Sequence, residues 1–382
     1  MKLIRFFALS LAALSLLPSC GRGGNASASP SGEGDTLALS DATNLSIIEH
    51  PDFTEVRIRN PWDTTRLLHS YALIERDAPA PSSLDPALTP VRVPLQKSVV
   101  FSGVHASLIA EFGHLDAVDG VCDVDYIFDP LLKERIADGK IIDCGNNTSP
   151  NMERIISISP EAVLLSPYES TAGHGKLDRM GVPVIECADY MEPSPLGRAE
   201  WMKFYGRLFG EGAAADSIFK EERAEYLRLK KEASLSSFRP AVVFDRIYGN
   251  AWYVPEKYST TGRFIEDAGG RNPFSFRQSA GSAPLSPEEV FLKGKDAGFW
   301  FIRHAGEKIS YSTLGNENPL YPRFEAFGRR SVFVSDTSKS HIFEDAAFHP
   351  HFLLADMISI LHPEIPSEHL GFTRRKYYTP LK

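Results

Sequence analysis

The sequence predicts an α/β protein of two lobes, each with a mainly parallel β-sheet, joined by one long rigid helix. Residues 212–234 have no Gly or Pro in their interior and are rich in Ala, Glu, Lys, Arg and Leu, which are strong helix formers. Apolar side chains recur on one face of this stretch at helical spacing, namely Ala215, Ile218, Phe219, Tyr226 and Leu229. On both sides of it, short apolar runs alternate with helical patterns, which is typical of parallel sheets covered by helices. An ordinary surface helix within one large domain is the alternative interpretation.

Length and composition narrow the class of protein. The 382 residues are too many for one small core and suit two domains. Hydrophobic residues make up 43% of the chain and charged residues 24%, as in a globular protein. The formal net charge of -8 argues against nucleic-acid binding as the main task.

The first twenty residues are typical of an export signal. Lys2 and Arg5 precede an apolar run that is too short to span a bilayer. The run ends in Leu17-Pro18-Ser19-Cys20, which is similar to a bacterial lipobox, in which the thiol receives a diacylglycerol. We therefore predict a signal peptide over residues 1–19, lipidation of Cys20 and attachment to a membrane through that lipid alone. Secretion with Cys20 unmodified is the alternative.

Two segments separate this signal from the lobes. Residues 20–43 are rich in Gly, Ser and Ala and poor in large apolar groups, so we predict a flexible tether. In residues 44–90, β-like runs at Phe53–Ile58 and Leu67–Ile74 flank the turn signal Asn60–Asp63. We predict that these runs form an N-terminal β-hairpin extension, followed by a proline-rich connector.

Residues 91–195 form the predicted N-terminal lobe and residues 237–382 the C-terminal lobe. The strands expected in the first are Ser98–Phe101, Ala117–Val121, Ile141–Ile142, Ala162–Leu165 and Val184–Ile185, with helices between them. The strands expected in the second are Ala241–Phe244, Phe299–Ile302 and Ser331–Val334. Residues 196–236 are expected to form a helix pair, consisting of Leu196–Phe209 and the long helix.

Cys122, Cys144 and Cys187 lie in the predicted N-terminal lobe. An odd number of cysteines in an oxidising compartment leaves at least one thiol free, unless it bonds to another chain. Their spacing relative to each other and to His does not indicate zinc, so we expect small buried side chains. A disulfide between Cys122 and Cys144 stays open as an alternative.

Several stretches carry a family resemblance. Ser98–Ser102, followed by a helix that ends at Gly113, and Pro150–Leu165 (PNMERIISISPEAVLL) resemble the class III substrate-binding proteins of ABC importers, and Met180–Ile185 matches their next strand. These proteins are extracytoplasmic receptors for cobalamin, ferric siderophores and haem. The likeness covers residues 95–362. It implies Rossmann-like lobes with hinge motion limited by one helix. It also implies a monomeric binding protein, not an enzyme, that holds no cofactor and works with a dimeric ABC permease.

The resemblance also assigns two acidic residues to permease docking. In this family one surface Glu from each lobe docks against arginines of the permease, and by motif these positions fall on Glu153 and Glu288. Glu289 could replace Glu288 in this role. The structural alternative is that both residues only favour the first turn of a short helix.

The ligand site is expected beyond the carboxyl ends of the strands, as in other open α/β sheets. The side chains selected by this rule and by their chemistry are Ser102, His105, Tyr126, Tyr168, Arg246, Tyr248, Trp252 and Arg303. Aromatic rings suit flat chelates and corrin rings, and the arginines suit propionates or chelate carboxylates. Each residue also has a structural interpretation: the aromatic residues as loop anchors, His105 as a packed histidine and Arg246 as part of a salt bridge.

The His, Asp and Glu residues of these loops are too scattered to bind a bare metal ion, which needs three or four converging ligands. We therefore expect a chelated metal, either a ferric siderophore or a cobalamin-like corrinoid, with haem as the alternative ligand. His349 and His351 open the last predicted helix, far from the strand ends, and are interpreted as structural. Two alternatives come from other classes: a secreted hydrolase that uses Ser102 and His105, and an adhesion module without a small ligand. Ser102 lacks the G-x-S-x-G surroundings of a hydrolase nucleophile.

Overall fold

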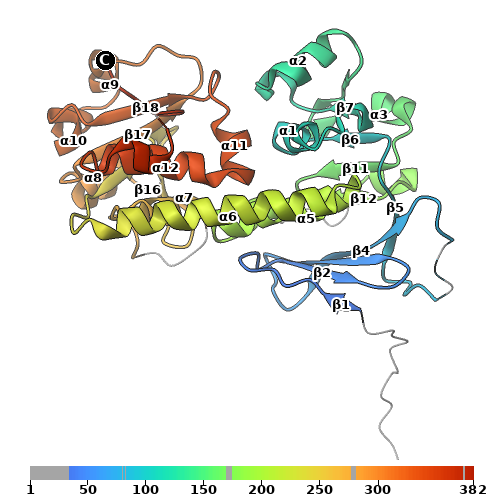
Figure 1. The fold of residues 1–382 in the computed structure, drawn as a ribbon. Helices are drawn as coiled ribbons and strands as arrows, with labels where there is room; N and C mark the ends of the chain where they lie inside the picture. Colours follow the sequence, from blue (N-terminus) through green and yellow to red (C-terminus); the bar gives the residue numbers. More distant parts are fainter. Residues whose placement is uncertain (1–33, 80, 82, 169–173, 277–280, 373–374) are drawn as a thin grey trace, which may run out of the picture. The chain divides into compact units, whose positions relative to one another are not determined.

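The computed structural model describes residues 34–79, 81, 83–168, 174–276, 281–372 and 375–382 (Figure 1). The predicted signal peptide and the predicted lipidation site Cys20 lie outside these ranges. Within them, no helix is both long enough and apolar enough to cross a membrane.

One helix, α6 (Gly212–Leu235), connects the cores of the two lobes, which confirms the central prediction. Ala215 and Phe219 are buried in the core of the N-terminal lobe, and Tyr226 and Leu229 are buried in that of the C-terminal lobe. Figure 1 shows α6 passing along both lobes. Because the helix has no Pro and no internal Gly that would kink it, both cores share one stiff element.

The N-terminal lobe is built on a parallel five-stranded sheet in the order β12-β11-β6-β7-β8. Its strands are β6 (Ser98–Val100), β7 (Val118–Val121), β8 (Ile142–Asp143), β11 (Ala162–Leu165) and β12 (Val184–Glu186). The connections contain α1 (Gly103–Glu111), α2 (Pro130–Ala137), α3 (Met152–Ile158) and the hairpin of β9 (Gly145–Asn146) and β10 (Ser149–Pro150). Apolar clusters cover both faces of the sheet, as the apolar strand sequences predict.

The N-terminal extension contains the predicted hairpin within a larger five-stranded sheet. Its strands are β1 (Asp35–Thr36), β2 (Leu45–Glu49), β3 (Thr54–Arg59), β4 (Leu67–Glu75) and β5 (Thr89–Val93), in this order across the sheet. The predicted β3–β4 hairpin is present, but β2 also pairs with β3, and β5 runs parallel to β4. The extension therefore reaches Val93 instead of residue 90, and its core is continuous with that of the N-terminal lobe.

The predicted flexible tether is corrected over residues 40–43, because two buried carboxylates hold residues 40–44. Residues 20–33 of the predicted tether lie outside the described ranges. Glu200 accepts hydrogen bonds from the first three backbone N–H groups of residues 40–44, at 2.9, 2.8 and 2.8 Å. Glu192 accepts hydrogen bonds from the last two, at 2.9 and 2.8 Å. A segment poor in large apolar groups is thus ordered by charge-assisted hydrogen bonds to distant residues, which its own composition does not reveal.

Residues 195–208 form two helices, α4 (Pro195–Glu200) and α5 (Met202–Leu208), so three helices stand where a pair was predicted. The break falls at the buried Trp201, whose Nε1 donates a hydrogen bond to Glu192 at 2.9 Å. Helix α5 packs closely against α6 at Gly206, where a Cβ atom would lie 2.5 Å from the Cβ of Ala215. The crossing of these two helices therefore requires glycine at position 206.

The C-terminal lobe contains a four-stranded sheet in the order β13-β17-β18-β19. β13 (Val242–Phe244), β17 (Phe299–His304) and β18 (Val332–Asp336) are parallel, whereas β19 (Thr379–Pro380) is antiparallel to β18. A separate antiparallel sheet of β14 (Ile247–Tyr248), β15 (Ala251–Pro255) and β16 (Ser282–Leu285) was not predicted. The helices are α7 (Thr260–Asp267), α8 (Pro287–Gly294), α9 (Tyr311–Glu317), α10 (Glu325–Gly328), α11 (Ile342–Phe348) and α12 (Pro350–Leu361). Two apolar clusters fill this lobe.

Cys122, Cys144 and Cys187 are free and buried, so the alternative of a Cys122–Cys144 disulfide does not hold. Burial raises the pKa of the Cys144 thiol to about 11. At neutral pH this group therefore stays protonated and packs as a small apolar side chain, as expected.

Candidate functional site

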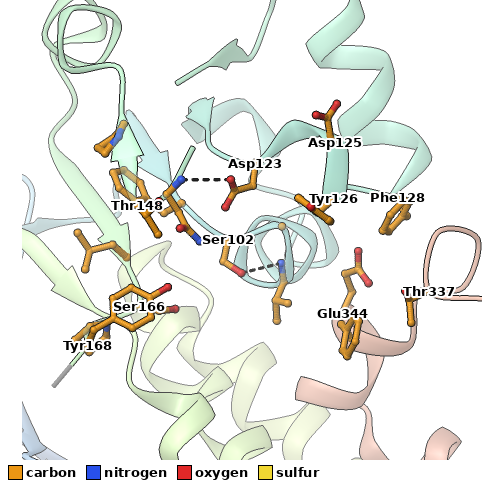
Figure 2. A pocket seen from close by; sticks show the side chains of 18 of the residues that line it. Ser102, Asp123, Asp125, Tyr126, Phe128, Thr148, Ser166, Tyr168, Thr337 and Glu344 are labelled. Carbon is orange, nitrogen blue, oxygen red and sulfur yellow. Dashed lines mark hydrogen bonds between the residues drawn. The ribbon is translucent and has the colours of Figure 1, made fainter. Parts of the chain in front are cut away.

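A cavity of about 640 Å³ lies between the lobes, beyond the carboxyl ends of β6, β7, β11, β17 and β18 (Figure 2). Its walls in the N-terminal lobe include Phe101, Ser102, Asp123, Asp125, Tyr126, Phe128, Thr148, Ser166, Tyr168 and His174. Its walls in the C-terminal lobe are Ala305, Thr337, Ser338, Phe343 and Glu344. Open α/β sheets bind their ligands at this position, and the volume lies within the usual range for small-molecule sites.

Two loops of the N-terminal lobe are fixed by side-chain hydrogen bonds, both drawn in Figure 2. Ser102 caps α1, because its Oγ accepts a hydrogen bond from the backbone N–H of Val104 at 3.3 Å. Asp123 adopts a left-handed conformation with φ of 53°, and its Oδ1 accepts the drawn hydrogen bond from the backbone N–H of Asn147 at 3.3 Å. The same oxygen accepts a hydrogen bond from Asn146 Nδ2 at 2.8 Å. The loop that carries Tyr126 is thereby tied to its neighbour before any ligand arrives.

Aromatic rings form much of the cavity wall. They are Phe101, Tyr126, Phe128 and Tyr168 from the N-terminal lobe and Phe343 from the C-terminal lobe. Tyr126 is 71% exposed, so most of its ring is available for contact. Such rings supply large contact areas for a planar or bulky organic ligand.

The charged side chains of the cavity wall are acidic. Asp123 and Asp125 come from the N-terminal lobe and Glu344 from α11 of the C-terminal lobe. Among the wall residues that the structure describes there is no Lys or Arg. Burial raises the pKa of Glu344, which is only 8% exposed, although nearby backbone N–H groups favour its ionised form.

The prediction that His105 contacts the ligand is wrong. The His105 side chain is buried, and its Nε2 lies 2.7 Å from Oδ1 of the buried Asp189. Tyr205 donates a hydrogen bond to the same carboxylate at 2.8 Å, and Arg198 donates one at 2.9 Å. Because His105 points into this core cluster while Ser102 caps a helix on the cavity wall, the two do not form a nucleophile and base.

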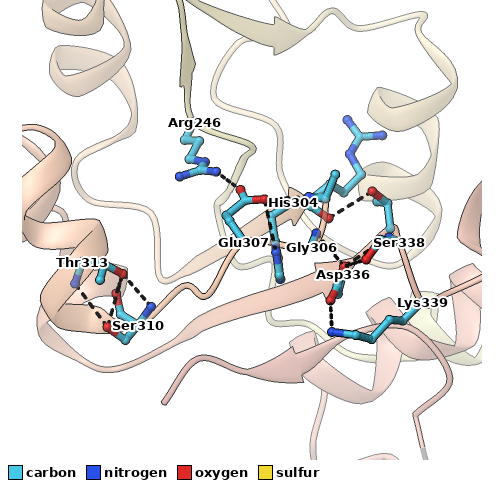
Figure 3. Close-up of polar contacts among 12 residues, drawn as sticks. Arg246, His304, Gly306, Glu307, Ser310, Thr313, Asp336, Ser338 and Lys339 are labelled. Carbon is cyan, nitrogen blue, oxygen red and sulfur yellow. Dashed lines mark hydrogen bonds and ion pairs between the residues drawn. The ribbon is translucent and has the colours of Figure 1, made fainter. Parts of the chain in front are cut away.

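The two predicted arginines, Arg246 and Arg303, also lie outside the cavity wall. Each guanidinium is paired with carboxylates of its own lobe. Arg246 forms an ion pair with Glu307 (Figure 3). A second ion pair joins Arg246 to Glu317 at 2.5 Å. Arg303, on β17, forms a bidentate pair with Asp245 at the end of the neighbouring strand β13, with Nε 3.0 Å from Oδ1. Neither guanidinium is therefore positioned for an anionic ligand.

The remaining two predicted contacts are displaced by the unpredicted antiparallel sheet. Trp252 on β15 is fully buried, and its Nε1 donates a hydrogen bond to the carbonyl oxygen of Phe244 at 2.9 Å. Tyr248 on β14 is 81% exposed but does not line the cavity. Of the eight selected residues, Ser102, Tyr126 and Tyr168 lie on the cavity wall.

Several wall residues were not selected from the sequence. Thr337 and Ser338 directly follow β18, so the rule about strand ends would have selected them. Glu344 lies on α11, whose seven residues are too few for a clear helical pattern. Phe128 follows a short 3-10 turn at Val124–Tyr126, and no sequence signal marked it.

The two predicted docking residues occupy matching places in the two lobes. Glu153 lies in the first turn of α3 after the capping residue Asn151, and Glu288 lies in the first turn of α8 after the capping residue Ser286. Both side chains are exposed. This geometry satisfies both the docking role and the helix-stabilising alternative, so docking stays a prediction.

His349 and His351 contact carboxylates from other elements. His349 Nε2 lies 2.8 Å from Glu111 at the end of α1, and its Nδ1 lies 3.3 Å from Glu222 on α6. His351 Nδ1 lies 2.6 Å from the same Glu222 carboxylate. Within the described ranges, no group of three or more His, Cys, Asp or Glu side chains could hold a metal ion.

These features define a class of protein. Two parallel-sheet lobes share one stiff helix, and an aromatic cavity lies between them. Ser102 and His105 do not form a nucleophile–base pair. This combination is typical of a solute-binding protein. Residues 121–336 of the 382 match the periplasmic binding protein family. The chain therefore belongs to this family, in its class III form, whose members are the substrate-binding proteins of ABC importers and not enzymes.

The chain is also similar to individual proteins. An uncharacterised lipoprotein of Methanocaldococcus jannaschii is 26% identical over 353 residues, which cover 86% of this chain and 83% of the relative. The structure of a periplasmic haem-binding protein from Pseudomonas aeruginosa matches with a TM-score of 0.56 and 17% identity, covering 71% of this chain and 94% of that one. The periplasmic vitamin B12-binding protein of Vibrio cholerae matches with a TM-score of 0.51 and 13% identity, covering 70% and 97%. At these identities the structural matches show the shared fold.

Proposed function

We propose that this protein is an extracytoplasmic receptor that binds a chelated metal, either a ferric siderophore or a cobalamin-like corrinoid, and delivers it to an ABC permease. The observation that carries the proposal is the cavity of about 640 Å³ between the lobes, with aromatic walls at the carboxyl ends of five strands. A chelate suits it better than a bare ion, because no group of metal-binding side chains is present within the described residues.

The structural neighbours that bind haem and vitamin B12 support the ligand class without choosing a member. Haem is the alternative ligand, but its two propionates would find no Arg or Lys on the described part of the wall. The arginines that were expected to receive them are paired with Asp245, Glu307 and Glu317.

Calorimetric titration of the purified protein with ferric siderophores, cyanocobalamin and haem tests the proposal. We expect saturable binding of a siderophore or corrinoid and a ligand-dependent rise in Tm. Tyr126→Ala should weaken that binding about tenfold through lost ring contact, whereas Tyr248→Ala, which changes an exposed tyrosine away from the cavity, should not. A folded protein that binds none of these chelates would overturn the proposal.

We further propose that Cys20 carries the lipid that attaches the receptor to a membrane. The lipobox-like sequence and the lipoprotein relative support this assignment. In cells, the wild-type protein should sediment with membranes and incorporate a labelled fatty acid, and Cys20→Ala should lose the label. An unlabelled wild-type protein in the soluble fraction would contradict it.

A further inference from the structure

The cavity wall carries negative charge from both lobes. Asp125 is exposed at the wall of the N-terminal lobe, and Glu344 comes from α11 of the C-terminal lobe. In Figure 2, Asp125 lies on the far side of Tyr126 from Glu344. Figure 2 shows the Glu344 carboxylate pointing into the space near Tyr126 and Phe128. The side chain is 8% exposed and forms no ion pair with another described residue. Burial raises its pKa, while hydrogen bonds from the backbone N–H groups of Glu344 and Phe128, and the nearby His341, act in the opposite direction. A carboxylate that is more than nine-tenths buried and faces a cavity favours a positively charged partner there.

Three cationic side chains approach wall residues without lining the cavity, and two of them are paired with carboxylates. Arg303 lies with its guanidinium 6.0 Å from the Phe343 ring, but Asp245 binds it in bidentate fashion. Lys339, beside the wall residue Ser338, pairs with Asp336 at 2.5 Å (Figure 3). The third is the exposed Lys133, whose Nζ lies 5.0 Å from the centroid of the Phe128 ring. The described part of the wall itself carries carboxylates and no Lys or Arg.

His174 is the one basic side chain on the described part of the wall, and a buried carboxylate balances it. Its Nε2 lies 3.0 Å from Glu186. Burial would raise the pKa of Glu186, but hydrogen bonds from His174 and His69 outweigh that effect and lower it. A proton on His174 therefore adds little net positive charge to the cavity.

We infer that the cavity selects chelates that carry a positive charge, with Asp125 and Glu344 recognising the charge and the aromatic rings contacting the chelate body. The inference rests on the proposed function and narrows its ligand class. A cationic group in the cavity near Glu344 gains Coulomb attraction in a partly desolvated site and can also lie over the faces of Tyr126 or Phe343, while Asp125 adds negative charge to the same wall. A ligand with free carboxylates would meet like charges there.

A series of chelates that differ only in charge tests this inference. Ferrioxamine B has a pendant ammonium group, its N-acetyl derivative is neutral and its N-succinyl derivative is anionic, while the iron site is the same in all three. Aquocobalamin, cyanocobalamin and a cobalamin monocarboxylate form an equivalent series on a corrin scaffold. On the scaffold that binds, we expect the cationic member to bind at least about tenfold more tightly than the anionic one at low salt, with a smaller ratio at high salt.

Variants locate the selectivity in the protein. Asp125→Asn combined with Glu344→Gln should reduce the charge preference to within about twofold, since both changes remove the charge and keep side-chain size. Glu134→Gln, at an exposed position on α2 outside the cavity wall, is the matched control and should keep the preference. Tight binding without charge preference, or a preference for the anion, would overturn this inference alone. Failure of all six chelates to bind would overturn it together with the proposed function.

Discussion

Asp189 is a fully buried carboxylate that stays ionised because three side chains surround it. Burial alone would raise its pKa, but the charges of His105 and Arg198 and hydrogen bonds from His105 and Tyr205 hold the pKa well below its usual range. The cluster joins α1 to residues that follow β12. It is therefore a structural element of the N-terminal lobe and not part of the ligand site.

Replacing Asp189 by Asn should lower the free energy of unfolding by about 3 kcal/mol at pH 7, because charged partners would stay buried without their carboxylate. The native pKa is depressed, so the contribution is present above the unfolded pKa near 3.8 and is lost as the pH falls through the lower native value. Urea unfolding of both proteins at several pH values measures this difference. A constant difference down to strongly acidic pH would contradict the assignment.

At the scale of elements, the crossing of α5 and α6 depends on one residue without a side chain. Gly206→Ala would place a Cβ 2.5 Å from Ala215 Cβ and 2.8 Å from the carbonyl oxygen of Glu211. We expect a loss of ~1–3 kcal/mol in unfolding free energy, because the helices must separate. Gly328→Ala in α10, where no atom lies within 4 Å of the new Cβ, is the control and should not destabilise the protein.

A second junction joins α1, α6 and α12 through His349. Burial would lower the pKa of His349, but hydrogen bonds to Glu111 and Glu222 and their charges raise it to about 10. Glu222 is 4% exposed, so the protonated imidazole compensates a buried charge. These contacts connect the long helix to both lobes at one point.

Because the native pKa of His349 lies above its unfolded value of 6.5, the stabilisation is complete below that pH and is lost as the pH rises through about 10. We expect His349→Gln to cost ~2 kcal/mol at pH 6 and progressively less as the solution becomes alkaline. Guanidinium unfolding between pH 6 and about pH 10 measures this trend. A difference that stays constant over the whole range would show that the imidazolium charge does not contribute.

At the scale of the whole molecule, α6 gives the two predicted docking residues a defined separation. Glu153→Arg and Glu288→Arg should each reduce ligand uptake in cells by more than about tenfold, since each would place like charges against a basic partner. Ligand affinity of the purified variants should not change, because neither residue lines the cavity. Glu134→Arg and Glu368→Arg reverse other exposed charges and should transport normally. Normal uptake by the Glu153 and Glu288 variants would leave only their helix-stabilising role.

Sequence patterns predicted the long helix and the parallel strands because these depend on local periodicity. They did not predict the five-stranded extension, in which β5 joins a sheet across a long connection, or the short helix α11. Side-chain roles were harder still. His105 contacts Asp189, which lies 84 residues away in the sequence, and Arg303 contacts Asp245, which lies 58 residues away. Local sequence therefore could not distinguish either residue from a ligand contact. Ser102, Tyr126 and Tyr168 were correctly placed on the cavity wall because that prediction used only the ends of strands.

In the proposed lipoprotein, the pairing of β1 with β2 and the hydrogen bonds of Glu192 and Glu200 to residues 40–44 shorten the segment between Cys20 and the folded body. The covalent path from Cys20 to Gly34 can span no more than about 50 Å even when fully extended. A receptor attached through so short a linker would stay close to the bilayer surface. The length of the linker would then set the effective concentration of the receptor at a permease in the same membrane. At a high effective concentration, the receptor would dock often even if its affinity for the permease were low.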